Sequence, residues 1–170
     1  MLALTDTSTT FFLVLLLGIG ATLVMDIWAF ALKRLWNIPS LDYALVGRWL
    51  AHMPKGILFH QNILNTSPVR FEGFLGWLSH YLTGIIFAAG LVSVVGLDWL
   101  VSPTFLPALL FGMATVVFPF FVMQPCFGFG IAASKTPKPM IARSKSLLTH
   151  SVFGAGLYFT AWAINLLGNF

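Results

Sequence analysis

The sequence predicts an all-α, four-helix transmembrane bundle with a short amphipathic cytoplasmic interfacial helix, and three observations lead to this prediction. Of its 170 residues, 58% are hydrophobic and only 8% are charged, whereas soluble domains carry about 25% charged residues. Several apolar runs reach the roughly 20 residues that a helix needs to cross a bilayer. The alternating pattern of membrane β-strands is absent, so helices must satisfy the backbone hydrogen bonds in lipid.

The apolar runs place four membrane helices in a single integral membrane domain that spans residues 1–170. The predicted helices cover residues 11–32, 74–95, 104–123 and 147–167. The connection at residues 96–103 is short, so we expect the second and third helices to form an antiparallel hairpin.

The first run also resembles a signal peptide, because Ala29-Phe30-Ala31 looks like a cleavage site. However, no basic segment precedes the run, Asp26 falls inside it, and Lys33-Arg34 follow it as a stop-transfer signal would. We therefore interpret the run as a retained helix.

The positions of the basic residues predict the orientation in the membrane. All nine Lys and Arg residues lie in the two longer connections: Lys33, Arg34, Arg48, Lys55 and Arg70 in the first, and Lys135, Lys138, Arg143 and Lys145 in the second. The positive-inside rule then places both connections in the cytoplasm and both termini on the non-cytoplasmic side. The net charge of +4 thus reflects membrane topology, and nucleic acid is not an expected partner.

The first connection contains the amphipathic helix, predicted at residues 41–53. Ser40 suits the N-cap, and Leu41, Leu45, Trp49 and Met53 share one helical face. Arg48, His52 and Lys55 share another face. Two arrangements stay open: a helix on the inner membrane surface, held by Trp49 and anionic headgroups, or a helix packed over the mouth of the bundle.

Polar side chains inside the spans are the candidate site, because such residues are costly in lipid and seldom face it. Asp26, His80, Gln124 and His150 come from four different helices. With helices of alternating direction, Asp26 and His80 would each lie about 9 Å below the cytoplasmic boundary and His150 about 5 Å below it. The sequence therefore predicts one polar layer near the cytoplasmic face.

Small residues at helical spacing indicate that these side chains face other helices. Gly18 and Thr22 share a face with Asp26, Gly76 and Gly84 share one with His80, and Gly154 and Asn165 share one with His150. Four loop residues could join the layer from the cytoplasmic side: Arg48, His60, Arg70 and Glu72. Either arginine could be the counter-ion of Asp26.

Three functions fit this layer. Its residues could connect the helices in a structural or partner-binding protein, the reading the sequence favours. They could instead hold haem or a transition metal in a membrane redox protein, with His80, His150, His60 and Asp26 as candidate ligands. As a third alternative, the layer could pass a proton, an ion or a small solute in a transporter or channel.

A catalytic function is less favoured than these three. No Ser-His-Asp pattern has a recognisable elbow, and Cys126 lacks a local catalytic signature. An intramembrane enzyme that uses His and Asp stays open. Beyond the lipid bilayer, the expected partners are a second copy of the chain or another membrane protein.

Five segments resemble a family of small bacterial membrane proteins, the domain-of-unknown-function family 2938. They are GIGATLVMDIWAF, VGRWLAH, GWLSHYLTGIIFA, FVMQPCFGFGIAASKTP and SLLTHSVFGAGLY, between Gly18 and Tyr158. The resemblance implies a multi-pass protein of the bacterial inner membrane. It implies no activity, substrate or catalytic residue.

Overall fold

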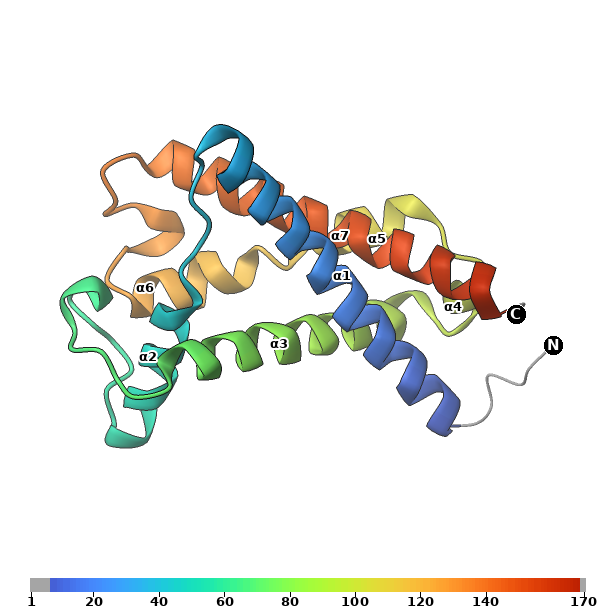
Figure 1. Ribbon diagram of the computed structural model, residues 1–170, viewed down its shortest axis with the longest axis horizontal. Helices are drawn as coiled ribbons and strands as arrows, with labels where there is room; N and C mark the ends of the chain where they lie inside the picture. Colours follow the sequence, from blue (N-terminus) through green and yellow to red (C-terminus); the bar gives the residue numbers. More distant parts are fainter. Residues whose placement is uncertain (1–6, 169–170) are drawn as a thin grey trace. The chain divides into compact units, whose positions relative to one another are not determined.

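The computed structural model describes residues 7–168, and in that range the chain is helical and contains no β-strand (Figure 1). The all-α prediction is confirmed. The helices that can span a membrane alternate with short helices and turns, which lie mainly in the first and second connections.

Among the described residues, four helices are long and apolar enough to cross a membrane. They are α1 (Thr7–Trp36), α3 (Glu72–Val95), the segment Phe105–Cys126, and Pro139–Leu167 within α7 (Pro139–Gly168). In the most apolar window of each, no more than 28% of the residues are buried within the protein. The predicted set of four helices that are long and apolar enough to span a membrane is therefore confirmed.

The ends of these helices differ from the predicted bounds, most of all in α7. This helix begins at Pro139, well before the predicted residue 147, because the polar segment that precedes the apolar run is itself helical. Its proline at the first helical position suits a helix start, where the missing N–H costs no hydrogen bond. Hydropathy marks the part of a helix that suits lipid, and helices continue beyond it.

The third span is interrupted by a π-helical turn. It begins with α5 (Phe105–Ala114), continues into π-helix at Pro119–Met123, and ends with α6 (Gln124–Cys126). Pro119 and Pro125 lack the N–H group that a regular helix needs, so the local backbone departs from α-helical geometry. Such turns are frequent at functional sites.

The described residues form two compact units, which share α3, α7 and the third span. The first contains residues 7–39, 81–114 and 149–168, and the second contains residues 40–80 and 115–148. A single domain over the whole chain stays a prediction.

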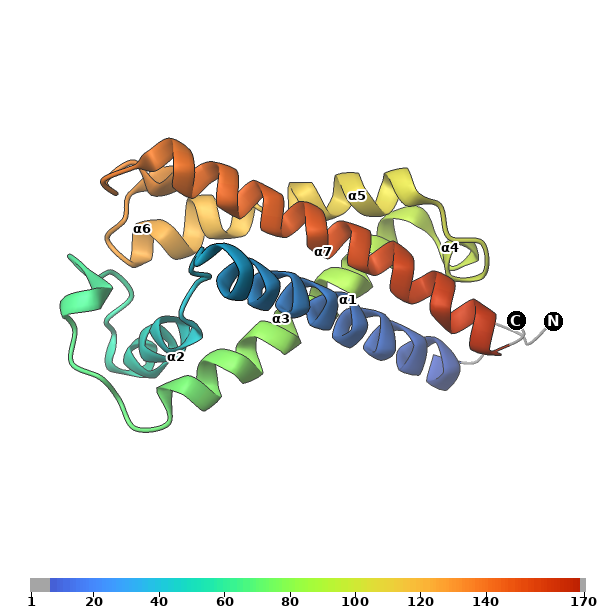
Figure 2. The same ribbon diagram turned by 45° about the horizontal axis from the view of Figure 1, so that its top comes forward.

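In the first unit, glycines let helices approach closely. A Cβ on Gly18 of α1 would strike the backbone of Ile85 in α3, and one on Gly112 of α5 would strike the backbone of Gly154 in α7. Gly84 of α3 lies against Thr22 of α1. Figure 2 shows α5 running beside α7. The predicted contact faces at Gly18, Gly84 and Gly154 are confirmed, in agreement with the general use of small residues between membrane helices.

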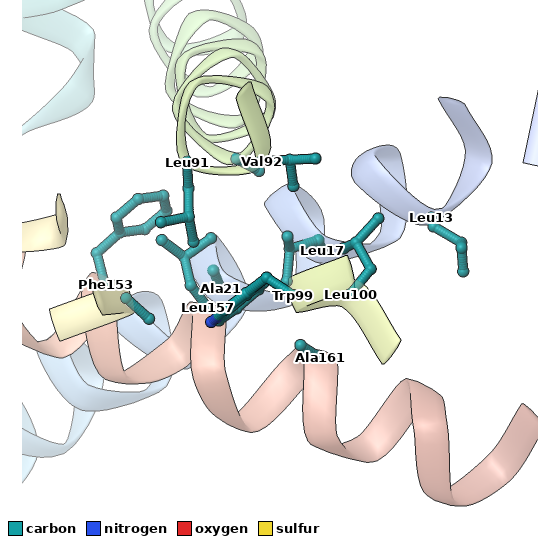
Figure 3. Packing of buried hydrophobic residues seen from close by; sticks show 12 residues of the cluster. Leu13, Leu17, Ala21, Leu91, Val92, Trp99, Leu100, Phe153, Leu157 and Ala161 are labelled. Atoms are coloured by element: carbon teal, nitrogen blue, oxygen red, sulfur yellow. The ribbon is translucent and has the colours of Figure 1, made fainter. Parts of the chain in front are cut away.

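The core of the first unit forms around Trp99 of the short helix α4 (Asp98–Val101). Figure 3 shows Leu17 and Ala21 of α1, Leu91 of α3 and Leu157 of α7 gathered near its ring. The Trp99 Nε1–H donates to the Thr104 carbonyl at 3.2 Å. The connection between α3 and α5 is thus packed into the unit by its own tryptophan.

The second unit has a smaller core around α2 (Tyr43–His52). Five buried residues form it: Leu45, Trp49, Ile63, Cys126 and Phe127. The amphipathic helix predicted at residues 41–53 is confirmed as α2, and Asp42, not Ser40, caps it by accepting from the Ala44 N–H.

Candidate functional site

The two longer connections fold together in the second unit. We call the residues of this unit outside the spans, 40–71 and 127–138, the cap. Two backbone hydrogen bonds tie the connections to each other: the His60 N–H donates to the Cys126 carbonyl at 2.8 Å, and the Ile63 N–H donates to the Phe127 carbonyl at 3.0 Å. At Gly128, with φ +84°, the backbone lies against the carbonyls of His60 and Gln61, where a Cβ would clash. The connections are therefore an ordered structure.

Trp49 is part of this structure. Its side chain is only 5% exposed, its ring lies edge-on to Phe127 at 5.7 Å, and its Nε1–H donates to the Leu58 carbonyl at 2.9 Å. Of the two arrangements that the sequence leaves open for this helix, the contacts of Trp49 favour packing on protein.

Arg48 holds the centre of the cap, although it is charged and only 8% exposed. Its Nε and Nη2 donate to the two carboxylate oxygens of Glu72, at 2.9 and 2.8 Å. Its Nη1 donates to the carbonyls of Ile63 and Thr66, at 3.2 and 2.8 Å. The hydrogen bonds that its guanidinium donates to Glu72 raise the pKa of Arg48 above its ordinary value.

All three nitrogens of the Arg48 guanidinium thus have acceptors. Its ion pair is with Glu72, in the same unit. Glu72 begins α3 and also accepts from the Val69 N–H at 2.8 Å, which fixes its carboxylate within reach of α2. The guanidinium of Arg70 lies 4.6 Å from the ring centre of Phe71. Asp26 belongs to the other unit, so a counter-ion for it from Arg48 or Arg70 stays a prediction.

The predicted polar residues of the spans each contact a different neighbour. In the first unit, the Asp26 carboxylate of α1 accepts from the Tyr81 hydroxyl of α3 at 2.9 Å. In the second unit, the ring of His80 stacks on Tyr43 of α2 at 4.0 Å between ring centres, with Trp77 edge-on at 5.8 Å.

Gln124 is buried, and its amide nitrogen lies 3.5 Å from the Ser146 hydroxyl of α7. His150 lies on α7 in the first unit, where its carbonyl faces Gly112 of α5. Asp26 and His150 belong to one unit and His80 and Gln124 to the other. Their gathering into one layer, and haem binding or transport by that layer, therefore stay predictions.

Sequence reasoning placed His52 on a face of the amphipathic helix but did not foresee that it lies beside His60. The rings of His52 at the end of α2 and His60 after the following turn lie 5.4 Å apart between centres, with their planes at 81° to each other. Gly56, with φ +76°, reverses the chain between them, and the Ile57 N–H closes the turn by donating to the His52 carbonyl at 3.3 Å. The only signal in the sequence is a turn-forming Pro-Lys-Gly between two histidines.

Burial lowers the pKa of His60, and the charge of His52 lowers it further. Its ring nitrogen Nε2 is one of three buried polar side-chain atoms in residues 7–168 that lack a hydrogen-bond partner; the others are Trp28 Nε1 and Gln124 Oε1. No group of three or more His, Cys, Asp or Glu residues in that range could hold a metal ion.

Comparison with known families agrees with the resemblance seen in the sequence. The family model described as "Protein of unknown function (DUF2938)" matches residues 15–164. No curated protein and no solved structure matches the chain.

Proposed function

This chain belongs to the DUF2938 family, and we propose that it is a structural protein of the bacterial inner membrane whose basic cap binds the anionic surface of the cytoplasmic leaflet. Both termini lie on the non-cytoplasmic side in this proposal. The observation that carries it is the ordered cap, held by the buried Arg48–Glu72 pair.

The contacts of the polar span residues support a structural role. Asp26 connects α1 to α3 through Tyr81, and His80 connects α3 to α2 through Tyr43. Hydrogen bonds between membrane helices contribute about 0.6–2 kcal/mol each. Polar residues used in this way stabilise a helix arrangement and need no bound solute.

The charge of the cap favours an anionic partner. It contains five basic residues, Arg48, Lys55, Arg70, Lys135 and Lys138, against one acidic residue, Asp42. Glu72 neutralises Arg48 from the adjoining span, and the remaining four basic residues are exposed. The cap of a second copy would carry the same positive charge and repel it, whereas anionic headgroups attract Lys and Arg by about 1 kcal/mol each.

Exposed apolar side chains beside these charges favour lipid over an acidic protein. Ile57, Leu58 and Phe59 are 43%, 47% and 71% exposed, and only Gly56 separates them from Lys55. The bond from Trp49 to the Leu58 carbonyl fixes this tripeptide, so its side chains stay outside the core. Apolar side chains next to basic ones are typical of segments that enter the boundary between headgroups and acyl chains.

The position of Phe59 in the membrane tests the proposal. A nitroxide label is attached to Phe59→Cys in a Cys126→Ala background, and the protein is reconstituted into nanodiscs that contain phosphatidylglycerol or only phosphatidylcholine. In the anionic discs we expect the label at position 59 to collide more often with oxygen, which is apolar, than with a water-soluble nickel complex. In the neutral discs this excess should be smaller. Asn65→Cys, which is exposed in the same cap, is the matched control and should favour the nickel complex.

Equal access of the nickel complex to labels at positions 59 and 65 in both kinds of disc would overturn lipid binding by the cap. Protection of position 59 only after addition of a purified acidic membrane protein would assign the surface to a protein partner instead. Neither label replaces Arg48 or Glu72, whose contact holds the cap together. Thermal unfolding of each labelled protein therefore shows separately whether the cap is still folded.

A further inference from the structure

We propose that His52 and His60 form a binding site for a transition-metal ion of the copper class, independent of the role of the cap at the membrane. The proposal stands on the hydrogen bonds of the two rings, on their spacing, and on the buried Nε2 atom of His60.

Hydrogen bonds fix which nitrogen of each ring is free to bind. The Nδ1 of His52 lies 2.8 Å from the Arg48 carbonyl, which can only accept, so Nδ1 carries the proton. The Nδ1 of His60 lies 3.1 Å from the Thr66 hydroxyl, and that hydroxyl donates to the Asn62 carbonyl at 3.4 Å. With its hydroxyl proton given to Asn62, Thr66 accepts from the Nδ1–H of His60. In this arrangement the lone pair of each neutral ring is on Nε2.

Anchoring of Nδ1–H by an oxygen is the arrangement that orients histidines as metal ligands, with Nε2 left for the ion. Here it occurs in two adjacent rings of the same unit. Arg48 strengthens both anchors, since it supplies the carbonyl for His52 and its guanidinium holds the Thr66 carbonyl at 2.8 Å. The buried Nε2 of His60 has no partner among the described residues, and a metal ion would give it one.

The spacing of the rings suits a shared ion. A metal about 2.0 Å from each Nε2 would lie roughly 3.2 Å from each ring centre. If both Nε2 atoms turn toward one ion, ring centres 5.4 Å apart give an angle of roughly 115° at the ion, between tetrahedral and trigonal values.

The number of ligands selects the metal. Structural zinc sites use four protein ligands and catalytic ones three, but no third His, Cys, Asp or Glu in residues 7–168 completes a group with this pair. With two imidazoles, affinity among divalent first-row metals is highest for Cu²⁺. Water fills the remaining positions, so the site would bind copper reversibly.

Copper titration of the full-length protein in detergent, with its affinity tag removed, tests this inference. Cu²⁺ is added as the sulfate, and binding is followed by calorimetry and by electron paramagnetic resonance. We expect one ion per chain, with splitting from two nitrogen ligands. His52→Gln and His60→Gln should each weaken binding by about tenfold or more. The chain's other histidines supply matched controls, because His80→Gln and His150→Gln should leave the affinity unchanged.

The anchor on Thr66 gives a second readout. Thr66→Val should weaken copper binding by about tenfold, and Thr66→Ser, which restores the hydroxyl, should recover it. Thermal unfolding without copper shows whether each variant is folded. The proposal is overturned if folded His52→Gln and His60→Gln bind copper as the wild type does, or if His80→Gln or His150→Gln abolishes binding.

Discussion

Both carboxylate oxygens of Glu72 accept from the guanidinium of Arg48, with Nε 2.9 Å from Oε2 and Nη2 2.8 Å from Oε1. The two side chains are 10% and 15% exposed, and they join α2 to the first residue of α3. A buried pair of this kind contributes little relative to apolar residues of the same shape, but removal of one partner leaves an uncompensated charge.

Arg48→Met should therefore destabilise the cap by about 3–5 kcal/mol. The variant Arg48→Met/Glu72→Leu should recover the part of the lost stability that is due to the unpaired carboxylate. It should not recover the part that is due to the Ile63 and Thr66 carbonyls, because these lose their donor in both variants. Hydrogen exchange of the amides at residues 60–66 and thermal unfolding in detergent measure both effects. A double variant less stable than Arg48→Met would refute this assignment.

The crossing of α2 over α3 depends on two glycines. A Cβ on Gly76 would clash with the Tyr43 carbonyl, and one on Gly47 would clash with the Glu72 carbonyl. Gly76→Ala should therefore separate the helices and lower the unfolding temperature, because backbone atoms cannot yield as a flexible side chain does.

Gly73→Ala is the matched control on the same helix. A Cβ at Gly73 meets nothing within 4 Å, so alanine should stabilise α3 by up to about 1 kcal/mol. The two substitutions add the same methyl group and should shift the unfolding temperature in opposite directions. Shifts of the same sign would contradict the close approach of α2 and α3.

Tyr81 gives a test of the structural role proposed for Asp26. Tyr81→Phe keeps the ring and removes the hydroxyl that donates to the Asp26 carboxylate. The expected loss is about 1.5–3 kcal/mol, the usual value for a hydrogen bond to a charged group. Tyr158→Phe is the control, since the Tyr158 ring contacts Phe105 and Phe159 and its hydroxyl makes no hydrogen bond with the described residues. Equal unfolding temperatures for both variants would remove the Asp26–Tyr81 connection from the structural argument.

The membrane helices could be predicted from the sequence because lipid demands a long apolar run and little else. The glycine contact faces could be predicted for the same reason, since close approach of Gly18 and Gly84 requires only small residues at helical spacing. The start of α7 could not be predicted, because its polar first turns are helical although hydropathy does not mark them.

The interior of the cap was predicted less well, because its contacts join residues far apart in the chain. Helical spacing predicts on which face of an amphipathic helix Arg48 and Trp49 lie, but it does not predict which partner each face meets. Burial of Trp49 depends on Phe127 from the other connection. The His52–His60 pair likewise depends on a turn at Gly56, and a single glycine in the sequence is not enough to predict that turn.

Accessibility of cysteines should distinguish the two faces of the membrane. In a Cys126→Ala background, Ser102→Cys in the connection between α3 and α5 and Asn65→Cys in the cap are both at exposed positions. A membrane-impermeant thiol reagent applied to intact bacterial spheroplasts should label position 102, and should label position 65 only after lysis. The positive-inside distribution gives this orientation. Labelling of position 65 in intact spheroplasts would reverse it and place the cap outside.

Gly56 should control the turn that brings His52 and His60 together. Its φ of +76° lies in the left-handed region, and a Cβ there meets nothing within 4 Å. Any effect of Gly56→Ala therefore comes from the backbone, with an expected loss of about 1–2 kcal/mol. Gly56→Asn should cost less, because asparagine enters this region more readily than alanine. Thermal unfolding measures the stability, and hydrogen exchange at Ile57 reports the turn directly, since its N–H bonds the His52 carbonyl. If alanine and asparagine proved equally harmless, the left-handed conformation at residue 56 would not be needed, and the contact of the two imidazoles would lose its structural cause.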